Sequence, residues 1–222
     1  MIDLAVFDLD GTLVDSRRDL ADAANAMVAG FGGTPLGEDA ITDMVGEGAR
    51  VLVSRVLAAA GLDARTPSAL EQFLEHYDAR LTAHTRPYPG IPEVLADLRS
   101  RMRLSVLTNK PMLATERLLA MLGLAGFFDG AVGGDTSCGR KPDPAGLLHL
   151  INDAGTTADR TVLVGDSAID LETARRAGTR IVLARYGFGY RFTGSEFRGD
   201  EGFVDSPSEL PGAIARANSE NH

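Results

Sequence analysis

The sequence predicts an α/β protein with a doubly wound, parallel (Rossmann-like) sheet and an inserted all-helical cap domain. Three observations lead to this prediction. Short apolar runs that end in polar turns recur along the chain, helical stretches separate them, and one long segment has only helical periodicity. Strands that alternate with helices pair in parallel. With 222 residues, 44% of them hydrophobic, the chain can form one large domain or two unequal ones.

Five apolar runs are expected to form the sheet. The first, Leu4 to Phe7, stops at an acidic turn and Gly11, and the others are residues 104–107, 130–132, 161–164 and 180–183. Helical periodicity covers residues 91–100, 111–122, 144–154 and 167–177. The stretch from Tyr186 to Phe203, rich in glycine and aromatic residues, indicates a surface loop, and a helix over residues 206–217 closes the chain.

The segment from residue 15 to 86 contains no strand pattern. Helices are expected over residues 16–29, 38–45, 49–60 and 68–84, and Ser16 with Asp19 three residues later is typical of a helix cap. The segment leaves the sheet after the first strand and returns before the second, so it should cover the strand ends where ligands bind. The predicted domains are therefore a core of residues 1–14 and 87–222 and a cap of residues 15–86.

Composition excludes several classes of function. Lys and Arg total 22 against 31 Asp and Glu, a net charge of −9, whereas a nucleic-acid binder needs a basic surface. No apolar run approaches the ~18 residues of a membrane helix. The single cysteine, Cys138, forms no internal disulfide, and the N-terminus lacks a signal-peptide pattern. We expect a cytoplasmic monomer or homodimer with neither nucleic acid nor membrane as partner.

Polar side chains stand at the carboxyl ends of several predicted strands, which are neighbours in a parallel sheet. Two carboxylates ~4 Å apart repel by about 4 kcal/mol at an effective dielectric constant of roughly 20, so several together need a cation. A set of oxygen ligands without His or Cys favours Mg²⁺ over Zn²⁺, and Mg²⁺ commonly completes its shell with substrate phosphate. The residues are Asp8, Asp10, Thr108, Asn109, Asp166 and Asp170, with Lys141 in an intervening loop. For Asp170 alone, a helix cap is the alternative interpretation.

These residues lie in four short motifs: Phe7-Asp8-Leu9-Asp10-Gly11-Thr12, Leu107-Thr108-Asn109, Arg140-Lys141-Pro142-Asp143-Pro144 and Gly165-Asp166-Ser167-Ala168-Ile169-Asp170. In this order they resemble the motifs of the haloacid-dehalogenase-like hydrolases. The resemblance runs from Leu4 to about Leu183, and the strand-free segment corresponds to the helical cap that part of the family carries between its first two motifs.

The resemblance implies a Mg²⁺-dependent phosphomonoester hydrolase that works through an aspartyl-phosphate. Asp8 would attack phosphorus, and Asp10 would protonate the leaving alkoxide and later deprotonate the attacking water. Asp8 and Asp166 would hold Mg²⁺, with help from the backbone carbonyl of Asp10. An acid at position 10 indicates phosphoester chemistry, because the dehalogenases of this family carry Tyr there.

The remaining motif residues would compensate charge. The resemblance implies that Lys141 neutralises the phosphoryl oxygens and the nucleophile, Thr108 donates a hydrogen bond to phosphate, and Asn109 offers its backbone N–H. Asp170 would be a supporting residue that orients Lys141 or metal-bound waters.

Further stretches are Val45-Gly46-Glu47-Gly48-Ala49-Arg50, Thr108-Asn109-Lys110-Pro111, Gly133-Gly134-Asp135 and Tyr186-Gly187-Phe188-Gly189. They resemble the branch of this family that hydrolyses 2-phosphoglycolate. Gly46 and Gly48 would let backbone N–H groups approach a small carboxylate substrate, and Arg50 would bind its carboxylate as a fork. The alternatives are a helix corner for the glycines and a solvated cation for Arg50. Lys110 could approach substrate or simply cap the next helix.

Three other functions compete with this one. The substrate could be a sugar phosphate, a nucleoside monophosphate or pyrophosphate. A phospho-accepting signalling receiver also combines a parallel sheet with clustered Asp, Thr and Lys, but receivers are shorter and have no helical insertion. A catalytically inactive relative is disfavoured, because every expected catalytic position keeps its residue.

Overall fold

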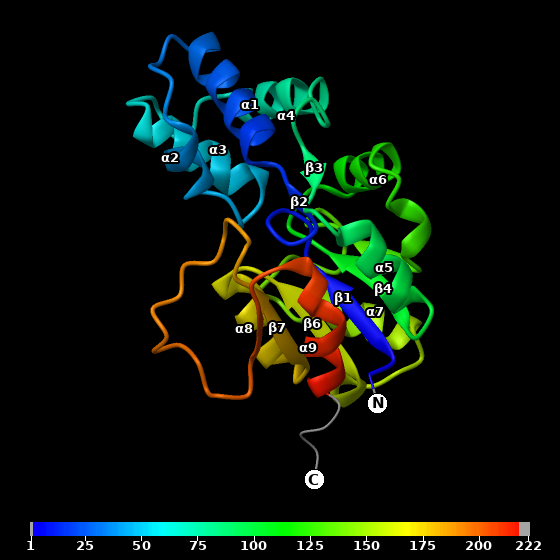
Figure 1. The fold of residues 1–222 in the computed structure, drawn as a ribbon. Coiled ribbons are helices and arrows are strands. Elements are labelled where there is room, and N and C mark those ends of the chain that lie inside the picture. The colour runs from blue at the N-terminus through cyan, green and yellow to red at the C-terminus, as the bar shows by residue number, and fades with distance from the viewer. Residues whose placement is uncertain (1, 218–222) are drawn as a thin grey trace.

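The computed structural model describes residues 2–217 of the chain. Its core is a six-stranded sheet in which every pair of neighbouring strands is parallel, in the order β5-β4-β1-β6-β7-β8 (Figure 1). The strands are β1 (Leu4–Phe7), β4 (Arg103–Leu107), β5 (Gly130–Val132), β6 (Thr161–Gly165), β7 (Arg180–Ala184) and β8 (Gly202–Val204). The predicted α/β fold is confirmed, and all five predicted strands are present.

Helices cover both faces of the sheet. On one face α5 (Ile91–Arg99) contacts α9 (Leu210–Ala217), and on the other α7 (Ala145–Asp153) contacts α8 (Ala168–Ala177). Residues of β1 alternate between the two apolar cores: Ala5 and Phe7 belong to one, Leu4 and Val6 to the other. A strand buried on both faces is apolar at every position, which is why these strands are recognisable as continuous apolar runs.

Four helices stand together away from the sheet (Figure 1), and we call them the helical insertion: α1 (Arg17–Gly30), α2 (Glu38–Thr42), α3 (Ala49–Ala59) and α4 (Ala69–Asp78). They lie between β2 (Val14–Asp15) and β3 (Arg86–Pro87), which pair antiparallel with Asp15 opposite Arg86. The sequence did not predict this ribbon, because strands of two residues leave no periodicity. The ribbon joins the two points at which the chain enters and leaves the insertion.

Several predicted element boundaries were wrong. The helix predicted over residues 38–45 ends at Thr42, and the α-helix predicted over residues 206–217 begins at Leu210. The last helix of the insertion ends at Asp78 rather than at His84, and tight turns follow, such as Ala83 N–H to the Arg80 carbonyl (2.9 Å). The loop from Tyr186 to Phe203 runs into strand β8, which pairs with β7. Three residues are too few for a recognisable alternation, so only pairing with the neighbouring strand identifies β8. The helix α6 (Met112–Met121) matches its predicted range within one residue at each end.

The predicted cap of the first insertion helix was also wrong. Ser16 makes no side-chain cap hydrogen bond, and its Oγ donates to Asp10 Oδ1 (2.6 Å). The carboxylate of Asp19 accepts hydrogen bonds from the backbone N–H groups of His84 and Thr85 and from Thr85 Oγ1 (2.7 Å). Both side chains therefore bind residues outside the helix: Ser16 binds the loop after β1, and Asp19 binds the segment that returns from the insertion.

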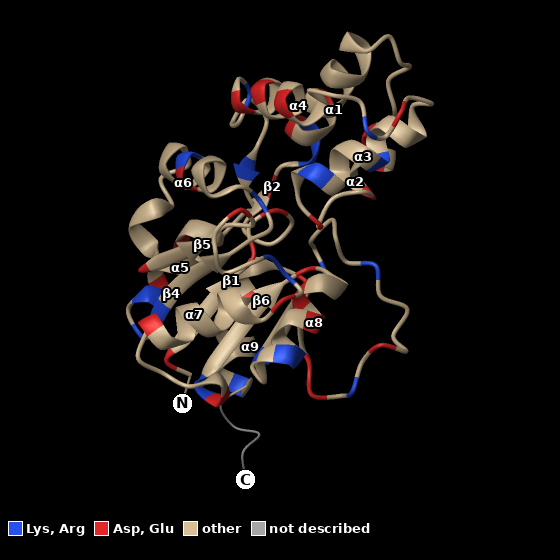
Figure 2. Cartoon of the chain, turned by 180° about the vertical axis from the view of Figure 1, so that it is seen from behind, with Lys and Arg blue, Asp and Glu red and all other residues tan. Residues whose placement is uncertain are grey.

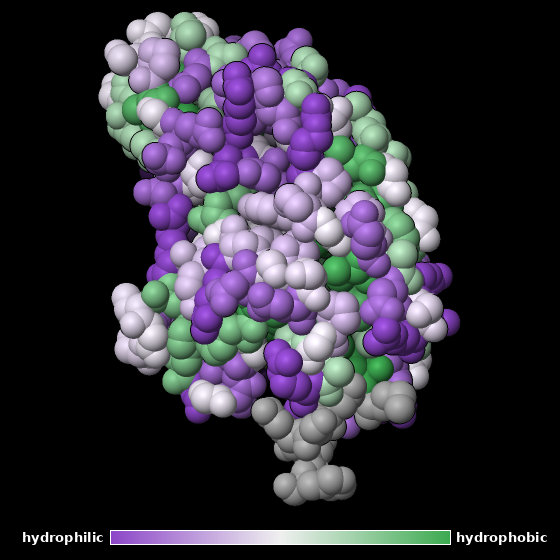
Figure 3. Space-filling model, viewed as in Figure 1, coloured by the Kyte–Doolittle hydropathy of each residue, from purple (hydrophilic) through white to green (hydrophobic). Residues whose placement is uncertain are grey.

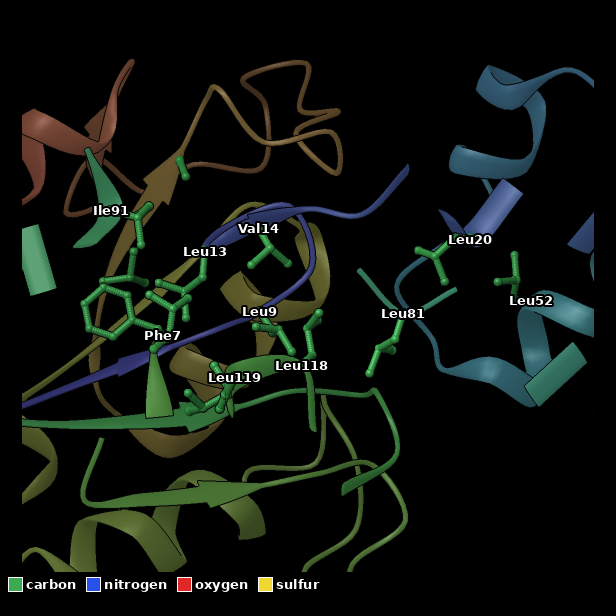
Figure 4. Packing of buried hydrophobic residues seen from close by; sticks show 14 of the residues in the cluster. Phe7, Leu9, Leu13, Val14, Leu20, Leu52, Leu81, Ile91, Leu118 and Leu119 are labelled. Atoms are coloured by element: carbon green, nitrogen blue, oxygen red, sulfur yellow. The ribbon is translucent and has the colours of Figure 1, made fainter. Parts of the chain in front are cut away.

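One apolar cluster extends from the sheet into the helical insertion. Figure 4 shows Phe7 and Leu13 beside the sheet, Leu20 and Leu52 in the insertion, and Leu81 between them. All five are buried. The insertion and the sheet therefore share a continuous hydrophobic contact.

Charged and apolar residues are mixed in the views of Figures 2 and 3. Figure 2 shows Lys and Arg interspersed with Asp and Glu over both the core and the insertion. Hydrophilic and hydrophobic residues likewise alternate on the face seen in Figure 3. Within residues 2–217, no helix has the length and apolar character needed to cross a membrane.

Candidate active site

The predicted site residues meet at the carboxyl ends of the central strands. Strand β1 has β4 on one side and β6 on the other, so the chain changes direction across the sheet there, at the point where such sheets bind ligands. Asp8 follows β1, Thr108 follows β4 and Asp166 follows β6, and all three are buried. Together with Lys141 they line a cavity of about 80 Å³ between the sheet and the helical insertion.

Three buried carboxylates form the acidic centre of this cavity. Oxygens of Asp8, Asp166 and Asp170 all lie within 4.8 Å of one another. Burial raises the pKa of Asp8 to about 7, although Lys141 opposes the rise. Burial and the charge of Asp8 raise the pKa of Asp166 well above its usual value. Crowded carboxylates of this kind, with oxygen as the donor, fit a hard divalent cation such as Mg²⁺.

Lys141 balances part of this negative charge. Its Nζ lies 2.6 Å from Asp8 Oδ1 and 2.7 Å from Asp170 Oδ1. Burial alone would lower the pKa of Lys141, but the charges of Asp170 and Asp8 outweigh burial and raise it. Lys141 therefore stays a cation at the side of the candidate nucleophile.

Asp170 makes both of the contacts that the sequence left as alternatives. Its Oδ1 accepts from Lys141, and its Oδ2 accepts from the backbone N–H (3.0 Å) and Oγ of Ser167 at the start of α8. With Ser167 Oγ accepting from the N–H of Asp170 in return, the two residues form a capping box. Because its oxygens are engaged in this way, Asp170 fits a supporting role better than a metal ligand.

Asp10 has a cationic partner that the sequence analysis left undecided. Lys110 Nζ lies 2.8 and 3.0 Å from the two carboxylate oxygens of Asp10 and 4.5 Å from the centre of the Tyr77 ring. Lys110 is 6% exposed. The signal for it was present in the sequence, because Lys110 and Lys141 are the two lysines of the whole chain.

Glycines allow the backbone to wrap closely around Asp166. A Cβ on Gly11, whose φ is +92°, would lie 2.0 Å from Asp166 Oδ2, and one on Gly187 would lie 2.3 Å from Asp166 Cβ. The N–H of Gly189 donates to Asp166 Oδ2 (2.7 Å). The loop that begins at Tyr186 is therefore part of the site, which the sequence indicated only through the family resemblance.

The insertion closes the cavity with its glycine turn. Asn109 Nδ2 donates to the carbonyls of Gly46 (2.9 Å) and Lys141 (3.0 Å). A Cβ on Gly48 would come within 3.1 Å of the Asn109 carbonyl, and both turn glycines have positive φ. Gly46 and Gly48 line the cavity as the sequence predicted, whereas Arg50 is exposed on α3 and lies outside its lining. Arg50 is thus the one predicted site residue that the structure does not bring to the others.

The parallel sheet and its buried acidic centre place the protein in the α/β class, with a site that fits phosphoryl chemistry. The chain matches the model of the haloacid dehalogenase-like hydrolases over residues 5–184. A phosphoglycolate phosphatase from Rhodospirillum rubrum is 45% identical over 191 residues, 82% of this chain and 79% of that protein. One from Cereibacter sphaeroides is 39% identical over 95% of this chain and 97% of its own length.

A solved structure supports the same assignment. The crystal structure of a predicted phosphoglycolate phosphatase from Haemophilus somnus superposes with a TM-score of 0.88 at 30% identity, covering 95% of this chain and 97% of that one. The chain belongs to the haloacid dehalogenase-like hydrolases, and the family predicted from its motifs is confirmed.

Proposed function

We propose that this protein hydrolyses a phosphomonoester and that its substrate is 2-phosphoglycolate, released as glycolate and phosphate. The observation that carries the proposal is the buried arrangement of Asp8, Lys141 and Asp166 in a chain whose relatives are phosphoglycolate phosphatases. Membership of a hydrolase family argues against the receiver-like alternative. The cytoplasmic location and the monomeric or dimeric state stay predictions.

In the first step a carboxylate oxygen of Asp8 attacks phosphorus, and the bond between phosphorus and the leaving oxygen breaks. Asp10 donates a proton to that oxygen, so glycolate leaves as the alcohol. In the second step Asp10 takes a proton from water, whose oxygen attacks the aspartyl-phosphate. Phosphate leaves and the Asp8 carboxylate is restored. The two residues stand on one turn directly after β1, which suits them to successive steps on the same bond.

Charge compensation comes from residues on the neighbouring strand ends. Lys141, held by Asp170, faces Asp8 and would neutralise the phosphoryl oxygens, while Thr108 and the N–H of Asn109 would donate hydrogen bonds to them. Asp8, Asp166 and the backbone carbonyl of Asp10 would hold Mg²⁺, which would supply further positive charge to the site.

We also propose that residues 15–86 act as a cap domain over the site. The hydrogen bond from Asn109 to Gly46 and the turn glycines in the cavity lining support this role. A cap that opens for substrate and closes for chemistry would keep bulk water away from the aspartyl-phosphate.

The test is phosphate release with Mg²⁺ from 2-phosphoglycolate, glucose 6-phosphate, β-glucose 1-phosphate, AMP and pyrophosphate. We expect kcat/KM for 2-phosphoglycolate to exceed the others by at least ~100-fold, about 2.7 kcal/mol of discrimination. A flat profile would refute the substrate but not the phosphatase chemistry. Asp8→Asn should abolish turnover and keep the circular dichroism spectrum, so an active variant would refute the nucleophile.

A further inference from the structure

We propose that Lys110 binds the carboxylate of the substrate, assisted by the hydroxyl of Tyr77 from the helical insertion. This inference rests on the proposed function, because it names the residues that would select a phosphorylated acid. Lys110 takes the role that the sequence predicted for Arg50. Arg50 is exposed on α3 and lies outside the cavity lining, so α3 provides no cation for the substrate carboxylate.

The distribution of lysine in the chain draws attention to Lys110. Lys and Arg total 22, yet only Lys110 and Lys141 are lysines, and both are buried in the lining of the cavity. Lys141 faces Asp8 and Asp170, on the side where phosphorus would bind. Lys110 lies in a different part of the same cavity, beside Asp10, and its compact ammonium group suits a narrow site better than a guanidinium.

Lys110 has a hydrogen-bond donor to spare. An ammonium group carries three N–H donors. In the described part of the chain, the two oxygens of Asp10 accept hydrogen bonds from Nζ, and the hydroxyl of Tyr77 is a further polar group close to it. A ligand carboxylate can therefore join Lys110 without breaking its pair with Asp10.

The hydroxyl of Tyr77 has no acceptor for its own proton among the described residues, and Lys110 is the cation close to it. Tyr77 lies on α4, is 3% exposed and lines the cavity. Burial raises the pKa of Tyr77 to about 12, although Lys110 opposes the rise, so the group remains protonated and able to donate. Buried polar groups are rarely left unpaired in folded proteins, and a bound carboxylate would satisfy this one.

The position of Lys110 matches the chemistry of 2-phosphoglycolate. Asp10 would protonate the leaving oxygen, and the substrate's carboxylate carbon is two bonds from that oxygen. Because Lys110 Nζ is one hydrogen bond from Asp10 (2.8 Å), it lies within reach of a carboxylate at that separation. The same contact would hold Asp10 beside the leaving group.

The rest of the insertion's lining favours a small acid over a sugar. Apart from Tyr77 and the turn glycines, it presents apolar side chains, which are Leu20, Val45, Ala49, Leu52, Phe73 and Leu74. They offer no partners for the several hydroxyls of a sugar phosphate, whose burial without hydrogen bonds is unfavourable.

The first experiment compares 2-phosphoglycolate with ethyl phosphate, the same ester with methyl in place of carboxylate. For Lys110→Met we expect the loss of kcat/KM on 2-phosphoglycolate to be about 100-fold greater than the loss on ethyl phosphate. Most of this extra loss should appear as a higher KM. For Tyr77→Phe the extra loss should be about 10-fold. Arg101→Met, at an exposed cation paired with Asp97, is the matched control and should change neither value. Equal losses on both substrates would mean that Lys110 merely supports Asp10, and would overturn the proposal.

The second experiment separates this inference from the proposed function. Protein labelled with ¹³C at lysine Cε has signals from two lysines only, and Lys110→Met assigns them. Glycolate should shift the Lys110 signal and leave Lys141 nearly unmoved, whereas phosphate should shift Lys141. This outcome would support the carboxylate subsite even if turnover favoured another phosphorylated acid. If saturating glycolate shifts neither signal, or Lys141 alone, the proposal is wrong.

Discussion

The carboxylate of Asp19 is expected to contribute strongly to stability, because it joins the helical insertion to the returning chain. Asp19 and Thr85 are both fully buried, and the carboxylate accepts from Thr85 N–H and Oγ1 at 2.7 Å each. In Asp19→Ala these two donors lose their acceptor inside the protein. At about 1–3 kcal/mol for each unsatisfied buried group, the free energy of unfolding should fall by roughly 2–6 kcal/mol.

The measurement is urea unfolding followed by far-UV circular dichroism, since the chain has no tryptophan. A loss near 4 kcal/mol corresponds to a fall in Tm of roughly 8–16 °C for a domain of this size. Asp19→Asn keeps an oxygen for Thr85 but loses the charge, and should cost only about 1–2 kcal/mol.

Asp22→Ala, on the same helix, is the matched control. Its exposed ion pair with Arg80 (3.5 Å) should contribute less than about 1 kcal/mol. If Asp19→Ala unfolds within about 0.5 kcal/mol of the parent, the assignment of Asp19 as a buried link is refuted.

Three further predictions concern the site and the pH dependence of stability. Gly11→Ala places a methyl group 2.0 Å from Asp166 Oδ2. We expect kcat/KM to fall by at least ~100-fold and the Mg²⁺ concentration needed for activity to rise. Kinetics close to those of the parent protein would contradict this packing. Asp10→Ala should slow phosphoenzyme formation by ~10²-fold or more on 2-phosphoglycolate. The rate on p-nitrophenyl phosphate should fall far less, because its leaving group needs no acid. Rapid-quench measurements that show equal losses on both substrates would argue against Asp10 as the acid. Burial would raise the pKa of Glu201, but hydrogen bonds from the N–H of Arg198 and the guanidinium of Arg175 (2.7 Å) outweigh burial and lower this pKa. The charged carboxylate therefore stabilises the fold above the usual glutamate pKa. This contribution is lost as the pH falls toward the pKa of Glu201 in the folded protein. Glu201→Gln should therefore be less stable than the parent at pH ~7, with a gap that narrows below pH ~4 in urea titrations; a gap independent of pH would show that the charge does not matter.

The apolar runs were sufficient to predict the strands of the core. Leu4–Phe7 occurs as predicted, because a parallel strand buried on both faces must be apolar throughout. The same reasoning placed Asp8 and Asp166 at one edge of the sheet, since the carboxyl ends of parallel strands coincide. These conclusions depend on local sequence and on a general rule of topology.

The partners of buried polar side chains depended on the tertiary structure. Ser16 and Asp19 fit a local helix cap by spacing, but Ser16 binds Asp10 in the loop after β1, and the folded chain brings Thr85 to Asp19 from a distant segment. Spacing along one helix carries no information about such contacts, because hydrogen bonds form with whichever groups packing brings near.

The cation on the insertion side of the cavity was likewise decided by packing. Arg50 and Lys110 were both candidates in the sequence, yet α3 carries Arg50 to the surface while the loop after β4 buries Lys110 between Asp10 and Tyr77. The sequence alone established the fold class, the motif residues and the hydrolase family. The choice of the cation that faces the substrate required the orientation of the helical insertion over the sheet, which no local pattern encodes.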